Sequence, residues 1–130
     1  MIKSKGKIIY DPIAGKANNK WWVIVECDEN IIKYYKYWVE KYYKVELNKP
    51  LFNAHISVVR GEEPLNKELW RYNHECEVDF YYSVDIENEN GYWWLRVFSK
   101  DLEDLREKLG LNKDVKFGFH LTIGKDNWYK

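Results

Sequence analysis

The same order of elements occurs twice along the chain, and this repetition constrains the fold more than any other feature of the sequence. Each half contains a bulky apolar segment that begins with two tryptophans, then a helix, then a strand with the pattern His-x-Ser/Thr. The expected strands are 21–27 and 55–60 in the first half and 93–98 and 117–124 in the second. The spacing from tryptophan to histidine differs between the halves, so the repeat is one of architecture more than of aligned sequence.

Two helices are expected between these strands. Asp28 can cap the first helix, and Ser99 can cap the second, which Gly110 ends. Between the halves, the partial alternation of residues 76–86 predicts a further strand, and the turn-forming residues 87–91 predict a hairpin turn. The four tryptophans of the apolar segments are expected in the core.

The length of 130 residues fits one domain, which we place at 1–130. Within it, the two halves predict two lobes, roughly 15–61 and 75–125, related by a pseudo-twofold around a central polar groove. We expect the protein to be a monomer with no obligate protein partner.

The charge balance limits the partners of such a groove. Lys plus Arg equals Asp plus Glu, at 21 each, so no overall positive field gathers long nucleic acids. The amino terminus lacks the apolar region of a signal peptide, and no apolar run reaches the length that spans a bilayer. These patterns predict a soluble, cytoplasmic protein with no membrane partner, in the host cytoplasm if the chain is phage-encoded.

Two of the three histidines are each followed, two positions later, by a residue with a hydroxyl group. The chain has only five Ser or Thr, yet His55 is followed two positions later by Ser57, and His120 by Thr122. Because side chains at i and i+2 of a strand share a face, each histidine points the same way as its hydroxyl. We therefore predict that two His-hydroxyl pairs meet in the groove.

Such a constellation suits the cleavage of a phosphodiester. One imidazole can take a proton from the attacking hydroxyl while the other protonates the leaving oxygen. The two hydroxyls, as fixed donors, can stabilise the charge that develops on the phosphoryl oxygens. Neither motif brings further ligands at metal-binding spacing, and Cys27 and Cys76 form no CxxC pair, so we predict neither a metal site nor a cofactor.

The segments HISVVRG at 55–61 and FHLTIGK at 119–125 resemble the paired motifs of the 2H phosphoesterase superfamily. The resemblance implies a bilobed α+β fold with two β-α-β lobes, with His55 and His120 as catalytic acid and base and Ser57 and Thr122 as phosphate ligands. The run WWVIVECDE with HISVVRGE is most similar to small bacteriophage proteins described as RNA-repair-like. Other members with this resemblance cleave cyclic oligonucleotide immune signals, which is an anti-defence activity.

Four further residues are candidates for substrate binding. Arg60 and Lys125 end the two motif strands and can neutralise phosphate, although strict alternation places them opposite the histidines unless the strand bends. Tyr10 and Trp128 are candidates to stack on a base. Core packing or plain exposure is the competing interpretation of both aromatic residues.

Three functions remain open at this point. The leading one is metal-independent hydrolysis of a cyclic phosphodiester in a small nucleotide, such as a cyclic oligonucleotide signal. The second is processing of RNA ends that carry 2′,3′-cyclic phosphates. The third is a non-catalytic module that sequesters nucleotides or binds single-stranded RNA.

Overall fold

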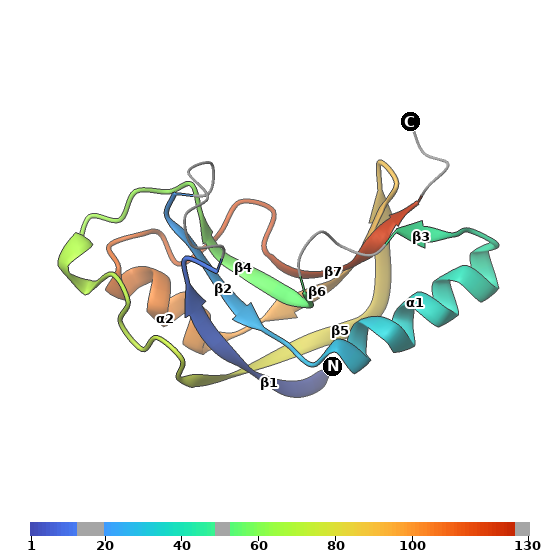
Figure 1. The fold of residues 1–130 in the computed structure, drawn as a ribbon, viewed down its shortest axis with the longest axis horizontal. Coiled ribbons are helices and arrows are strands. Elements are labelled where there is room, and N and C mark those ends of the chain that lie inside the picture. Colours follow the sequence, from blue (N-terminus) through green and yellow to red (C-terminus); the bar gives the residue numbers. More distant parts are fainter. Residues whose placement is uncertain (13–19, 49–52, 127–130) are drawn as a thin grey trace.

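The computed structural model describes residues 1–12, 20–48 and 53–126, and its main feature is one antiparallel sheet that closes on itself (Figure 1). The strand order is β3-β7-β4-β2-β1-β5-β6, and β6 also pairs with β7, so six strands form a closed barrel with β3 at the side of β7. The strands are β1 (Ile2–Tyr10), β2 (Trp22–Glu26), β3 (Leu47–Asn48), β4 (His55–Arg60), β5 (Glu77–Glu89), β6 (Tyr92–Phe98) and β7 (Phe119–Asp126).

Two α-helices connect strands of this sheet, α1 (Glu29–Tyr43) between β2 and β3 and α2 (Lys100–Lys108) between β6 and β7. The predicted caps are confirmed: Asp28 accepts a hydrogen bond from the backbone of Asn30 (2.9 Å), and Ser99 accepts one from Leu102 (3.2 Å). A short 3₁₀ helix, η2, lies at Lys67–Leu69. Within residues 1–12, 20–48 and 53–126, no helix is both long and apolar enough to cross a membrane.

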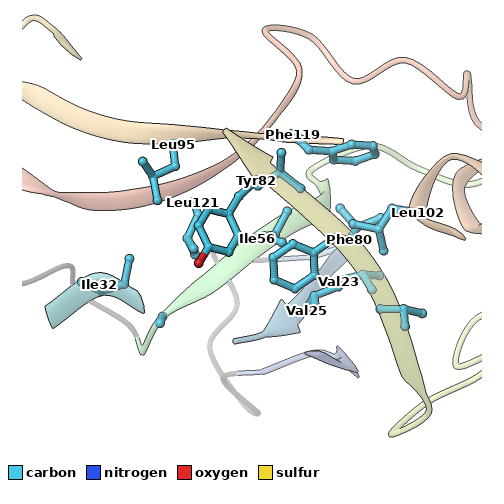
Figure 2. Packing of buried hydrophobic residues seen from close by; sticks show 14 of the residues in the cluster. Val23, Val25, Ile32, Ile56, Phe80, Tyr82, Leu95, Leu102, Phe119 and Leu121 are labelled. Atoms are coloured by element: carbon cyan, nitrogen blue, oxygen red, sulfur yellow. The ribbon is translucent and has the colours of Figure 1, made fainter. Parts of the chain in front are cut away.

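The core fills the interior of the closed sheet. Alternate residues of the motif strands point inward, and Ile56, Val58, Leu121 and Ile123 are completely buried, as the alternation predicts. Figure 2 shows Ile56 and Leu121 in this core together with side chains from other strands and from α2. The outer face of β4 and β7 is therefore the face that carries the histidines and hydroxyls.

The expected bilobed α+β fold, with two β-α-β lobes at 15–61 and 75–125 around a groove, is wrong. The structure is mostly sheet, and the two halves contribute neighbouring strands to one closed barrel. The sequence did not predict β1 or the short β3; β1 pairs with β2 on one side and β5 on the other and so joins the halves. The repeat of strand, helix and motif strand is real in order, but it does not build separate lobes.

Candidate active site

The two His-hydroxyl motifs lie on adjacent strands and face the same side. β4 and β7 are antiparallel with Ile56 opposite Leu121. One step along each strand from that pair, His55 faces Thr122, and Ser57 faces His120. The two histidines are diagonal neighbours, for which the typical Cα separation is about 7–8 Å. Imidazole rings at that spacing can both reach a single phosphate bound above the sheet.

Both imidazole rings are anchored in the same manner. Nδ1 of His55 lies 2.6 Å from the carbonyl oxygen of Asn53, and Nδ1 of His120 lies 3.2 Å from that of Gly118. A carbonyl oxygen can only accept, so Nδ1 of each ring carries the hydrogen and donates it. In the neutral ring Nε2 then holds the lone pair, so this is the atom at which the ring can accept a proton.

A one-residue irregularity follows the hydroxyl in both motif strands. Between β2 and β4, Ser57 and Val59 pair with consecutive residues, so Val58 is an extra residue. Between β6 and β7, Thr122 and Gly124 pair with consecutive residues, so Ile123 is the extra residue. Each is a β-bulge, and the extra residue reverses the facing of every position after it.

The bulges bring a cation from each strand onto the histidine face. The Arg60 guanidinium carbon lies 4.9 Å from the ring centre of Trp22, and the Lys125 ammonium lies 5.2 Å from that of Tyr92. Trp22 also contacts His55, and Tyr92 lines the same groove as His120. Because the strands run in opposite directions, the two cations lie at opposite ends of the row of motif side chains. Both predicted substrate-binding cations therefore lie on the same face of the sheet as the histidines.

Trp22 supports the first motif from β2. Its indole Nε1 donates a hydrogen bond to the Ser57 hydroxyl oxygen (3.2 Å), and its ring meets that of His55 edge to face at 5.8 Å between centres. With its oxygen accepting from the indole, Ser57 is oriented to donate its own hydrogen to a ligand. The indole thus fixes both side chains of the motif.

Burial lowers the pKa of His55 below its ordinary value. The carbonyl of Asn53 opposes this effect by stabilising the charged ring, while the positive charge of Arg60 and the neighbouring His120 add to the lowering. The ring is therefore neutral over a wider range of pH, which is the state that a general base requires.

A groove of about 690 Å³ runs along the second motif. His120 and Thr122 line it, and its other walls come from Arg60, from the outer face of β6 and from the β5–β6 hairpin. Arg96 lies directly opposite His120 in the sheet, and Trp94 lies opposite Thr122. The volume is in the range of sites for small organic ligands.

Arg96 and its partner Glu87 are site residues that sequence reasoning missed. Arg96 Nε donates to Glu87 Oε2 at 2.8 Å across the β5–β6 pair, and both side chains line the groove. The signal was the alternation of the 93–98 strand, which places Trp94 and Arg96 on one face, but nothing in the sequence pairs that strand with β7. The expectation that all four tryptophans are core is wrong for Trp94, whereas Trp93 is in the core.

Of the two predicted base-stacking residues, the structure describes only Tyr10, which does not join the site. Tyr10 is 2% exposed in the core, its hydroxyl donates to the carbonyl of Tyr72 (2.7 Å), and its backbone nitrogen donates to Nδ1 of His74 (3.2 Å). Burial raises the pKa of the Tyr10 hydroxyl, as expected for a structural residue. Trp128 lies outside the described residues.

Metal-ligating groups do not cluster in the part of the chain that the structure describes: no three His, Cys, Asp or Glu side chains there come together in a way that could hold an ion. Cys27 and Cys76 are both free thiols. Burial raises the pKa of the Cys27 thiol to about 12, so this sulfur is protonated at neutral pH.

Comparisons with models of known protein families, with curated proteins and with solved structures find no match.

Proposed function

We propose that the protein is a metal-independent phosphodiesterase that cleaves a phosphodiester in a small nucleotide by acid–base catalysis between His55 and His120. The observation that carries the proposal is the pairing of Ile56 with Leu121, which sets two anchored imidazoles and two hydroxyls together on the outer face of the sheet. A structural role explains one surface histidine readily. A structural role does not explain two histidines in matched settings, each followed along its strand by a hydroxyl residue, a β-bulge and a cation.

In the proposed reaction one imidazole, at Nε2, removes the proton from the attacking oxygen, which bonds to phosphorus as the bond to the leaving oxygen breaks. The other imidazole, protonated at Nε2, gives its proton to the leaving oxygen. His55 is the better candidate for the base, because burial lowers its pKa. The nucleophile is a ribose 2′-hydroxyl for a 3′–5′ linkage, or water for a 2′,3′-cyclic phosphate.

Charge stabilisation comes from donors that are already in place. Ser57 and Thr122 can donate to the two non-bridging oxygens, and Arg60 and Lys125 add positive charge at either end of the row. Fixed donors of this kind reduce the reorganisation that accompanies the change in charge. The substrate class that we favour is a cyclic oligonucleotide, because the protein has no net charge and the groove has the size of a small ligand.

Processing of RNA ends with 2′,3′-cyclic phosphates is a second candidate with the same chemistry. It is favoured by the position of the site on the outer face of the closed sheet, where the end of a longer strand has access. Turnover of oligoribonucleotide ends with little on cyclic oligonucleotides would support it over the first.

The test is a turnover assay in the presence of a chelator, with cyclic dinucleotides, cyclic trinucleotides and RNA ends as substrates. Wild type is expected to turn over at least one of these without metal. His55→Ala and His120→Ala are each expected to lose at least about a hundredfold, which is the usual contribution of an acid–base group. His74→Ala is the matched control, because this third histidine lies outside the groove.

Two outcomes would overturn the proposal. One is a requirement for a divalent ion. The other is nucleotide binding without turnover of any substrate, which would identify a sequestering module instead.

A further inference from the structure

The aromatic residue at one end of the groove has an unusual setting. Phe117 is 85% exposed, yet its side chain lines the same groove as His120 and Thr122. Its backbone is left-handed, with φ at 68°, a conformation that is unfavourable for any residue with a Cβ. Phe117 is absent from the hydrophobic core, so packing within the described residues does not account for it.

The turn that presents Phe117 also sets the position of His120. Gly118 follows with φ at 73°, and its carbonyl oxygen anchors Nδ1 of His120. The position of the phenyl ring is therefore coupled to that of the catalytic imidazole through only two residues. A group bound on Phe117 is a direct neighbour of a phosphate bound at His120.

A phenylalanine stands three positions before the histidine in both motifs, Phe52 before His55 and Phe117 before His120. Phe52 lies outside the described residues. His55 and Ser57 do not line the groove, and His120 and Thr122 do. Among the described residues, the aromatic lining of this groove therefore lies beside the second motif.

The remaining groove residues suit a nucleoside better than a row of phosphates. Trp94 lies opposite Thr122, and Tyr92 forms a second exposed ring toward the hairpin. Beside these rings, Glu89 places a carboxylate on the groove wall, where the carboxylate of Glu87 is already paired with Arg96. Carboxylates repel further phosphates but accept hydrogen bonds from base amino groups and ribose hydroxyls.

We propose that this groove is a nucleoside subsite in which Phe117 stacks on the base of the nucleoside whose ribose carries the scissile phosphate. The inference rests on the proposed function for the position of the phosphate, and it deepens that function by assigning the side on which the nucleoside binds. The Lys116 ammonium, 5.2 Å from the ring centre of Phe117, is placed to reach the sugar-phosphate edge of such a ligand. The preferred substrate then carries an aromatic base on the His120 side of the bond that breaks.

The test compares two ligands that differ only in the base, adenosine 5′-monophosphate and ribose 5-phosphate, by titration calorimetry. Stacking of one base typically changes affinity by about 5- to 150-fold. Wild type is expected to prefer the adenine nucleotide by a factor in that range. Phe117→Ala is expected to remove the preference and leave ribose 5-phosphate binding unchanged, and Phe117→Trp to retain it.

Two further variants separate binding from structure. Leu65→Ala removes a comparably exposed apolar side chain, 82% exposed and outside the groove, and should keep the preference. Phe117→Gly should lose the preference while its melting temperature stays equal or rises, because glycine adopts the left-handed backbone freely. A structural role for Phe117 predicts the opposite change in melting temperature.

Equal affinity of wild type for the two ligands, or an undiminished preference in Phe117→Ala, would overturn the subsite. This readout is independent of catalysis. A base preference that depends on Phe117 in a protein without turnover would support the subsite while the phosphodiesterase proposal fails. Turnover with no base preference would support the phosphodiesterase proposal while the nucleoside subsite fails.

Discussion

Replacing Arg106 by Met should destabilise the protein and disturb the site from the opposite side of the sheet. Arg106 is on α2 and only 1% exposed. Its Nη1 donates to the carbonyl of Val58 (2.8 Å), and its Nε donates to that of Asn112 (2.7 Å). Nη1 and Nη2 also bind the two carboxylate oxygens of Glu62, each at 2.8 Å. Val58 is the bulged residue of β4, so this guanidinium holds the bulge that turns Arg60 toward the histidines.

The size of the effect follows from what the substitution leaves behind. Breaking a buried ion pair from one side typically costs about 3–5 kcal/mol. The Glu62 side chain is 39% exposed, so water partly solvates the carboxylate that remains, while the carbonyls of Val58 and Asn112 lose a donor. We expect a loss of about 2–4 kcal/mol in the free energy of unfolding.

Urea denaturation measures this loss, with the helix residue Lys100 as control. Lys100→Met removes an exposed ion pair with Asp104 and should leave stability nearly unchanged. In Arg106→Met, kcat/KM should also fall under conditions where the variant is folded, because Arg60 loses its position. A variant within about 0.5 kcal/mol of wild type would refute the reasoning.

The same ion pair predicts a dependence of stability on pH. Hydrogen bonds from Arg106 hold the pKa of Glu62 below its ordinary value. A lowered carboxyl pKa means that the folded state binds fewer protons, so the stabilisation is present above about pH 4.5 and disappears as the pH falls through the lowered pKa. Glu62→Gln should flatten this part of the stability curve, and a curve that keeps its full slope would contradict the assignment.

Three further predictions concern the site and the sheet. With His55 as base, the acidic limb of the pH profile of kcat/KM should lie below pH 6.5. Arg60→Gln should move this limb to higher pH, because the loss of a nearby positive charge eases protonation of the His55 ring. A limb that stays in place in Arg60→Gln would argue against His55 as the base. Lys125→Gln should lower kcat/KM about tenfold in a steady-state assay, and Lys125→Arg should retain most of the rate; equal rates for all three proteins would exclude phosphate contact. Gly6→Ala should cost about 1–3 kcal/mol in urea denaturation, because a Cβ there would overlap Val25; unchanged stability would show that β1 and β2 can move apart.

The local elements of the motif regions were predictable from sequence because short-range patterns determine them. The apolar residues Ile56 and Leu121 alternate with polar ones, which places His55 and His120 outward whatever the topology. The helix caps Asp28 and Ser99 act on backbone groups two and three residues away. Interactions of such short range are visible in the sequence itself.

The closure of the sheet was not predictable in this manner. β1 alternates lysines with small or apolar residues and includes Gly6, so it has a weak strand pattern on its own. It forms because β2 and β5 supply hydrogen bonds on both sides. Which strands pair depends on long-range contacts, and two repeated units fit separate lobes as readily as one closed sheet.

The bulges were the other feature that alternation could not reveal. VVR after Ser57 and IGK after Thr122 both read as regular strand, which places the cations on the wrong face. The extra residue is visible only through the register with the neighbouring strand. For β4 it is stabilised by the contact of Arg106 with Val58, 48 residues apart in the chain. Arg96 could not be predicted as a site residue for the same reason, because it becomes a neighbour of His120 only through the register of the β6–β7 pairing.

The most direct measurement is the turnover rate of a cleaved nucleotide by His55→Ala, His120→Ala and the double variant, each with chelator present. If both imidazoles act on one phosphate in one step, each single variant loses at least about a hundredfold and the double variant is little worse than the weaker single. A single variant within tenfold of wild type, or single losses that multiply in the double variant, would show that the two histidines do not share a reaction.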